Sequence, residues 1–235
     1  SMPARSSRVE EEGVLIDDFQ IVAAERLLES ETRALFSSGA HPARNVNQNM
    51  ADLRAQIAAC ASGAGELRRL VTQYGRNVVD AYMGHVQDNA AEAVRRVIAT
   101  LHDGAFVNRL DDGSQIAVQI EVDRTARTAV IDFSGTSPQH ALNFNAPRSV
   151  VRAAVLYVFR TLVTDAIPLN DGCMAPLTLR IPAGSMLDPH HPAAVVAGNV
   201  ETSQAIVDTL YGALGLLAGS QGTMNNFTFG DATHQ

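Results

Sequence analysis

The stretch FVNRLDDGSQIAVQIEVDRTARTAVIDF, residues 106–133, decides the fold of this chain. Apolar and polar residues alternate from Ile116 to Val122 and again from Ala129 to Phe133, which is the period of a strand with one buried face. Asp112-Gly113, which precedes the first of these runs, is a dipeptide typical of a hairpin turn. The stretch therefore predicts a small antiparallel β-meander of three strands.

The sequence before the meander has a helical period instead. Between residues 47 and 102, apolar residues recur every three or four positions, which predicts amphipathic helices. Gly75 suits the C-cap of a first helix, and Asn77 suits the N-cap of a second. We therefore expect a long antiparallel helical hairpin over residues 47–102.

The helical hairpin, the β-meander and the sequence on either side of them together predict the α+β fold class. We expect residues 1–46 to be a mostly polar approach segment with one helix, at residues 21–36. Residues 103–235 are expected to form the α+β portion, and the whole chain to be one compact fragment of a larger domain.

Further buried helices and short strands are expected after the meander. Pro147 suits the first position of a helix that runs to about Val163 and is apolar nearly all round, which predicts a central helix. A second helix is expected over residues 201–217. Short apolar runs at residues 177–181 and 195–200 predict two more strands.

The composition excludes several functions. The 235 residues carry 25 acidic and 18 basic side chains, a net charge of -7, which argues against nucleic acid or an anionic membrane as a partner. No Lys is present, so a phosphate-binding loop, a pyridoxal Schiff base and a Lys nucleophile are all excluded. The two cysteines, Cys60 and Cys173, are far apart and are expected to be reduced thiols in a cytoplasmic protein.

Three loops hold the polar residues that helix and strand patterns do not explain. Two of these loops lead into predicted helices, whose first N–H groups can hold a carboxylate, a phosphate or an amide oxygen. Asn, Ser and Thr are also common capping residues at helix starts, so both interpretations stay open. The candidates are Asp132, Asn143, Asn145 and Arg148 in the first loop, Asn199, Glu201 and Thr202 in the second, and Asn225 and Asn226 in the third.

No metal site is expected in this chain. Asp188, His190 and His191 have the chemistry of metal ligands, but adjacent residues of an extended chain point in different directions and no fourth ligand is evident. The motifs HExxH, GxSxG and GxGxxG are all missing, so no self-contained catalytic signature is present.

Four runs, in the same order along the chain, resemble the hydantoinase B/5-oxoprolinase family. Two further phrases, at residues 49–56 and 143–148, are similar within this family to the B-type region of the ATP-dependent 5-oxoprolinases. The resemblance extends over nearly the whole chain. The four runs are DFSGTS at 132–137, IPLNDGC at 167–173, GNVETS at 198–203 and GTMNN at 222–226.

The resemblance implies an enzyme that opens a cyclic amide, such as 5-oxo-L-proline to L-glutamate in glutathione metabolism. An A-type ATPase domain or subunit would bind ATP and Mg and activate the amide, and this chain would bind no cofactor. Water addition would then be completed by the B-type region. The implied catalytic residues are Asp132, Glu201 and Asn199, and the implied substrate-binding residues are Asn143, Asn145, Arg148, Thr202, Asn225 and Asn226.

Other interpretations stay open. The family's B-type chains are longer, so we expect a central fragment that is inactive alone. The substrate could instead be a hydantoin, or a ketone as in an acetone-carboxylase-like subunit. A non-catalytic assembly module is the third interpretation, in which the loops dock an A-type partner and the helices associate with further copies of the chain.

Overall fold

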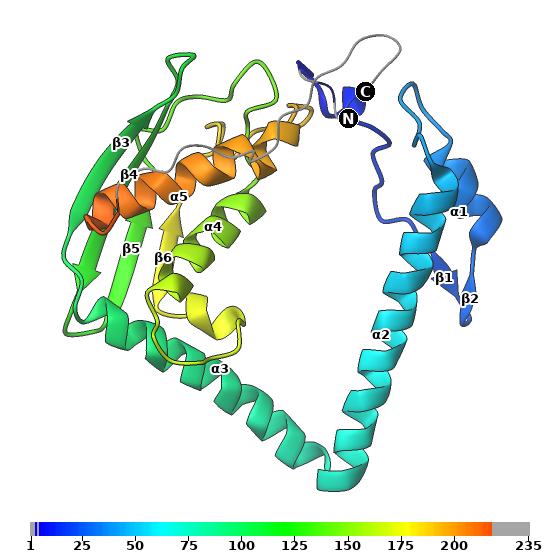
Figure 1. The fold of residues 1–235 in the computed structure, drawn as a ribbon, viewed down its shortest axis with the longest axis horizontal. Coiled ribbons are helices and arrows are strands. Elements are labelled where there is room, and N and C mark those ends of the chain that lie inside the picture. The colour runs from blue at the N-terminus through cyan, green and yellow to red at the C-terminus, as the bar shows by residue number, and fades with distance from the viewer. Residues whose placement is uncertain (1–2, 4, 218–235) are drawn as a thin grey trace.

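The computed structural model describes residue 3 and residues 5–217 of the chain. Helices and strands are mixed, which confirms the α+β fold class. Figure 1 shows an open ring rather than a compact body, because one lobe holds the main sheet and two long helices lead away from it to a small N-terminal unit. The described N-terminal residues return to the sheet lobe and close the ring.

The main sheet contains the predicted meander. Its strands β3 (Gly104–Arg109), β4 (Gln115–Asp123) and β5 (Thr128–Asp132) pair antiparallel, with Ile120 opposite Ile131. Gly113 turns the chain between the first two strands at φ 86, a left-handed conformation that glycine adopts without strain. The predicted strand near residue 177 also forms, as β6 (Leu177–Arg180), and pairs parallel with β5.

Two helices cover one face of the sheet and build the core. Helix α5 (Glu201–Leu214) packs across β3 and β4, and α4 (Arg148–Thr161) packs against α5. Helix α4 buries Val155 and Phe159 completely, whereas Tyr157 is exposed. The helix expected from Pro147 to about Val163 therefore forms and contributes to the core, but only one of its faces is buried.

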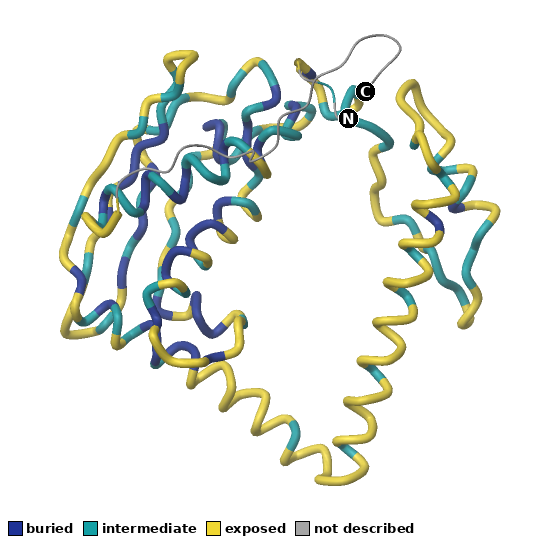
Figure 2. Tube along the Cα trace, in the orientation of Figure 1, coloured by how far each residue is buried: buried dark blue, intermediate teal, exposed yellow. Residues whose placement is uncertain are grey.

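The long helices α2 (Val46–Tyr74) and α3 (Arg76–Ile98) form the predicted hairpin, but its arms separate from the turn at Gly75 (Figure 1). Gly75, at φ 82, ends α2, and α3 begins at the next residue, so the expected cap at Asn77 is wrong. Figure 2 shows that both arms are largely exposed and that only the end of α3 enters the core. There Ala90, Val94 and Ile98 are fully buried.

The N-terminal helix is shorter than predicted. Residues 22–27 form a two-stranded hairpin, β1 (Val22–Ala23) and β2 (Arg26–Leu27), and the helix α1 covers only Glu29–Phe36. The expected helix over residues 21–36 is therefore wrong in its first half. The reason is local, since Ala24 and Glu25 have φ values of 47 and 63, which a right-handed helix cannot contain.

The described residues also contain three 3-10 helices, which are η1 (Val9–Glu11), η2 (Asp171–Met174) and η3 (Val196–Asn199). The strand expected at residues 195–200 is therefore wrong, because this segment coils into η3 and leads directly into α5. Helix α5, which was expected over residues 201–217, ends earlier, at Leu214. Gly215 caps it in the left-handed conformation, with φ 66.

Candidate functional site

Two of the three predicted loops lie against each other. The amide N–H of Ala197 donates to the carbonyl of Asn143 at 3.1 Å, and the Thr202 hydroxyl donates to the carbonyl of Phe144 at 2.6 Å. Gly198 lies so close to the first loop that a Cβ atom there would be 2.2 Å from the Asn145 carbonyl oxygen. The starts of α4 and α5 are therefore held together by direct backbone contact.

Asn145 is the centre of this junction. Its side chain is fully buried and its Nδ2 donates to the carbonyls of His140, Leu142 and Ala194, at 2.9 to 3.0 Å, while its Oδ1 accepts from the His140 N–H at 2.7 Å. Asn143 is also buried, and its Nδ2 donates to the Pro3 carbonyl and the Ser6 hydroxyl. With Thr202, these predicted substrate-binding residues make contacts within the fold, and their role toward substrate stays a prediction.

Arg148, the first residue of α4, lies in a cleft of about 430 Å³ between this helix and the segment 188–195. Its guanidinium donates to Asp188 at 2.9 Å, and about half of the side chain is exposed. The cleft therefore combines an Arg148–Asp188 ion pair with the N-terminal end of a helix, so a carboxylate bound there would share the guanidinium with Asp188. Its lining comprises Val9, Leu15, Pro147, Arg148, Ser149, Asp188, Pro189, His190, His191, Ala193 and Val195.

Glu201 and Asn199 stand at the start of α5. Asn199 is exposed and uses its carbonyl to accept from the Ser203 hydroxyl at 3.0 Å. The Glu201 carboxylate is half-buried and has no hydrogen bond or ion pair with the residues that the structure describes. A carboxylate can accept a proton from water, and the role of Glu201 as a base stays a prediction.

Asp132, the last residue of β5, has more partners. It accepts a hydrogen bond from the Ser134 N–H at 2.8 Å and lies 3.7 Å from the guanidinium of Arg180 on β6. Hydrogen bonding from Ser134, followed by the charge of Arg180, lowers the pKa of Asp132 below its ordinary value of 3.8. A carboxylate with a lowered pKa is a weaker base, which argues against Asp132 in that role.

The lowered pKa of Asp132 predicts a pH effect on stability. The folded state favours the ionised form of Asp132. The contribution of this carboxylate to the free energy of unfolding is therefore fully present above pH 3.8 and is lost as the pH falls through the folded-state pKa. We expect Asp132→Asn to lower the melting temperature at pH 6 and to differ less from the wild type near pH 3. Thermal melts from pH 3 to pH 6 measure this difference. The exposed carboxyl of Asp17 supplies the control, since Asp17→Asn should leave the profile unchanged.

Glu12 is a residue that the sequence patterns did not single out. Its carboxylate accepts hydrogen bonds from the N–H groups of Val195 and Val196, at 2.9 to 3.0 Å, and from the Ser6 hydroxyl at 2.8 Å. It therefore ties the N-terminal segment to the beginning of η3, directly before Asn199. The only signal in the sequence was the run of three glutamates at residues 10–12.

Asp188, His190 and His191, the residues with the chemistry of metal ligands, line the cleft around Arg148. Asn225 and Asn226 lie outside the described residues. His191 is 3.9 Å from Glu10, and Asp188 is paired with Arg148. Within residues 3 and 5–217, no three His, Cys, Asp or Glu side chains come together as metal ligands. No helix in the same part of the chain is long and apolar enough to cross a membrane.

The family model for hydantoinase B/oxoprolinase matches residues 1–235. The chain therefore belongs to this family, as the order of its motifs indicated. A curated relative named 5-oxoprolinase, from Dictyostelium discoideum, is 41% identical over 99% of this chain. The match covers 19% of that relative, so the chain spans about a fifth of the length of this 5-oxoprolinase.

Two solved structures share the fold. The ATP-dependent caprolactamase from Pseudomonas jessenii matches with a TM-score of 0.74 and 20% identity, over 89% of this chain and 37% of that one. The nucleotide-free acetone carboxylase matches with a TM-score of 0.70 and 16% identity, over 88% of this chain and 29% of that one. Because both matches cover nearly all of this chain, its arrangement of helices and sheet is shared with the two enzymes.

Proposed function

We propose that this chain is part of the B-type region of an ATP-dependent cyclic amide hydrolase that converts 5-oxo-L-proline to L-glutamate. The observation that carries the proposal is the similarity to 5-oxoprolinase over 99% of the chain, at 41% identity. ATP and Mg would be bound by an A-type ATPase domain or subunit, which activates the amide oxygen by phosphorylation. The chain contains no Lys and would bind no nucleotide itself.

Three residues at the starts of α4 and α5, of which only Arg148 lines the cleft, fit three tasks in water addition. Arg148 would bind the substrate carboxylate, because a guanidinium beside a helix N-terminus favours an anion. Glu201 would take a proton from the attacking water as the new C–O bond forms and the electron pair of the activated C–N double bond moves to the ring nitrogen. The C–N bond would then break, with that proton passing to the leaving amine, and a second water would release phosphate from the acyl phosphate to give glutamate. The exposed amide of Asn199, two residues away, would donate to the phosphorylated oxygen of the tetrahedral intermediate.

The setting of the enzyme belongs to the same proposal. We infer a cytoplasmic hydrolase of glutathione metabolism, since 5-oxoproline is a cyclised glutamate. A hydantoinase-type B subunit from Pseudomonas sp. is 29% identical over 69% of this chain, which supports a hydantoin as the alternative substrate. ATP-dependent release of glutamate from 5-oxoproline by the complete A-plus-B system tests the choice. No release by a system that binds ATP normally would overturn the 5-oxoproline assignment.

The role of Arg148 gives a prediction for the complete system. We expect Arg148→Gln to raise KM for 5-oxoproline by about 10- to 100-fold, which corresponds to the loss of one charged hydrogen bond. Steady-state kinetics measure the effect. Arg152→Gln is the matched control, because Arg152 lies on the same helix, is similarly exposed and also pairs with an aspartate, Asp171, yet does not line the cleft.

A second variant separates substrate binding from a role in the fold. Asp188→Asn breaks the same ion pair as Arg148→Gln but leaves the guanidinium in the cleft. An increase in KM for Arg148→Gln alone supports a carboxylate anchor. Equal effects of the two variants, or loss of assembly with the A-type partner, would support the assembly-module interpretation instead.

A further inference from the structure

The N-terminal segment at residues 5–12 lies against both loops of the candidate site (Figure 1). The N–H of Val9 donates to the carbonyl of Pro192 at 2.9 Å, in the loop that leads to η3. On the side of α4, the Asn143 amide donates to the Ser6 hydroxyl at 3.2 Å. The segment therefore connects the loop before α4 to the loop before α5.

The Glu12 carboxylate is the central acceptor of this connection. Its Oε1 accepts from the Val196 N–H at 2.9 Å and from the Ser6 hydroxyl at 2.8 Å, and both of its oxygens lie 3.0 Å from the Val195 nitrogen. A chain of hydrogen bonds thus runs from Asn143 through Ser6 and Glu12 to the start of η3. Ser6 and Asn143 are buried, and a charged acceptor makes stronger hydrogen bonds than a neutral one, so this chain holds the two loops firmly.

The 3-10 helix η3 depends on outside contacts for its position. It has only four residues, and a helix of this kind and length has few hydrogen bonds of its own, such as the one from the Gly198 N–H to the Val195 carbonyl at 2.9 Å. Asn199 is the last residue of η3, and Glu201 begins α5 two positions later. A shift at the start of η3 would therefore displace the donor and the base of the proposed function.

We propose that Glu12 is a positioning residue for water addition, an inference that rests on the proposed function. Glu12 acts through η3 and not by contact with the substrate. It fixes the start of this helix, so that Asn199 and Glu201 keep their places relative to the substrate. Arg148 is held separately, by its ion pair with Asp188, so loss of Glu12 would displace the donor and the base but leave the carboxylate anchor in place.

Steady-state kinetics of the complete A-plus-B system test the inference. We expect Glu12→Ala to lower kcat for 5-oxoproline by about 10- to 100-fold, because a displacement of about 1 Å can cost about 100-fold in rate. KM should stay unchanged, since Arg148 is not affected. A purely structural role would lower the melting temperature instead and, well below that temperature, would leave kcat per folded enzyme unchanged.

Two further variants complete the kinetic test. Glu12→Gln keeps the length of the side chain and the Oε1 acceptor, but it places an amide N–H group where Oε2 faces the Val195 N–H, so kcat should fall less than in Glu12→Ala. Glu11→Ala is the matched control. Glu11 is the preceding residue, and its carboxylate accepts from the N–H and the hydroxyl of Ser7, at 2.9 and 3.1 Å, within its own segment. Its loss should leave kcat unchanged.

Hydrogen–deuterium exchange of the same complete system adds a measurement that does not depend on turnover. Peptides that contain residues 195–199 should exchange faster in Glu12→Ala than in the wild type or in Glu11→Ala, whereas peptides from β4 should keep their protection. Together with the fall in kcat at constant KM, this local change supports a positioning role.

The outcomes separate this inference from the proposed function. If the wild type releases glutamate but Glu12→Ala has an unchanged kcat, or unchanged exchange at residues 195–199, the positioning role is overturned and the 5-oxoproline assignment stands. Faster exchange that extends to β4, or a rise in KM in place of the fall in kcat, overturns the positioning role as well. A wild type that binds ATP normally but releases no glutamate overturns both.

Discussion

Glu201→Gln is expected to lower kcat of the complete A-plus-B system by about 10²- to 10⁴-fold, the usual contribution of a general base. Gln keeps the size and the hydrogen-bonding capacity of Glu but cannot take a proton from water. KM should change little, because the substrate carboxylate is bound by a different residue, Arg148. Initial-rate measurements of glutamate release across a range of 5-oxoproline concentrations provide both constants.

A capping role for Glu201 predicts the opposite combination. As an acidic residue in the first turn of α5, Glu201 stabilises the helix dipole by about 0.3–1 kcal/mol, so its loss would lower the melting temperature slightly and leave kcat intact. Glu121→Gln, a change of an exposed carboxylate on β4, serves as the control for kcat. If Asp132→Asn abolishes turnover while Glu201→Gln does not, Asp132 is the base.

Gly198→Ala is expected to destabilise the chain by about 3 kcal/mol, at the upper end of overpacking effects. The added Cβ would lie 2.2 Å from the Asn145 carbonyl oxygen and 2.9 Å from the Ala146 Cα. Both are backbone atoms, and the four hydrogen bonds of the Asn145 side chain hold that loop in place. The two loops would have to separate, so the cleft at the start of α4 should be disturbed as well.

Thermal unfolding measures the effect of Gly198→Ala, with an expected decrease in Tm of about 10 °C for a chain of this size. Gly63→Ala is the matched control. Gly63 lies inside α2 with nothing within 4 Å of the added Cβ, so alanine should stabilise the helix by about 0.5–1 kcal/mol. Equal Tm values for wild type and Gly198→Ala would show that the junction of the two loops is looser than the structure indicates.

The pairing of loops at the candidate site could be predicted only in part from the sequence. The polar residues of the first two loops were recognised because they interrupt helix and strand patterns. Their hydrogen-bond partners could not be recognised, because these partners are distant in the sequence. The hydrogen bond between Asn145 and Ala194 joins residues 49 positions apart, and the one between Val195 and Glu12 joins residues 183 positions apart. Asn143, Asn145 and Thr202 also had two interpretations at that stage, and only burial revealed their contacts within the fold.

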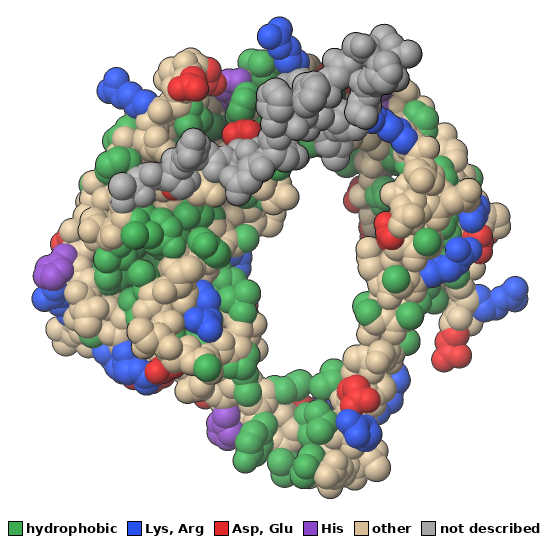
Figure 3. All heavy atoms as spheres, in the orientation of Figure 1, with side chains coloured by type: hydrophobic (Ala, Val, Ile, Leu, Met, Phe, Trp, Pro, Cys, Tyr) green, Lys and Arg blue, Asp and Glu red, His purple; other side chains and the backbone are tan. Residues whose placement is uncertain are grey.

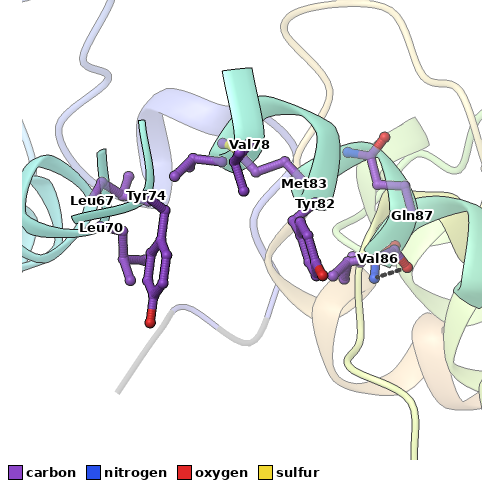
Figure 4. A pocket seen from close by; sticks show the side chains of 10 residues that line it. Leu67, Leu70, Tyr74, Val78, Tyr82, Met83, Val86 and Gln87 are labelled. Carbon is purple, nitrogen blue, oxygen red and sulfur yellow. Dashed lines mark hydrogen bonds between the residues drawn. The ribbon is translucent and has the colours of Figure 1, made fainter. Parts of the chain in front are cut away.

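The sequence by itself determined features that depend on neighbouring residues. The alternation at residues 116–133 predicted the strands, and the helical period at residues 47–102 predicted the long helices. Four motifs in the same order indicated the family. Tertiary structure decided the rest. It placed β6 parallel to β5, opened the arms of the hairpin at Gly75 and paired Arg148 with Asp188. The physical reason is that the period of apolar residues shows which face of a helix or strand is apolar. Which other element packs on that face depends on contacts between distant parts of the chain. The turn between α2 and α3 is a clear case, because Leu67, Tyr74 and Tyr82 follow the spacing of a core-facing stripe, yet the structure leaves their side chains exposed (Figure 4), where Figure 3 shows hydrophobic side chains on the surface.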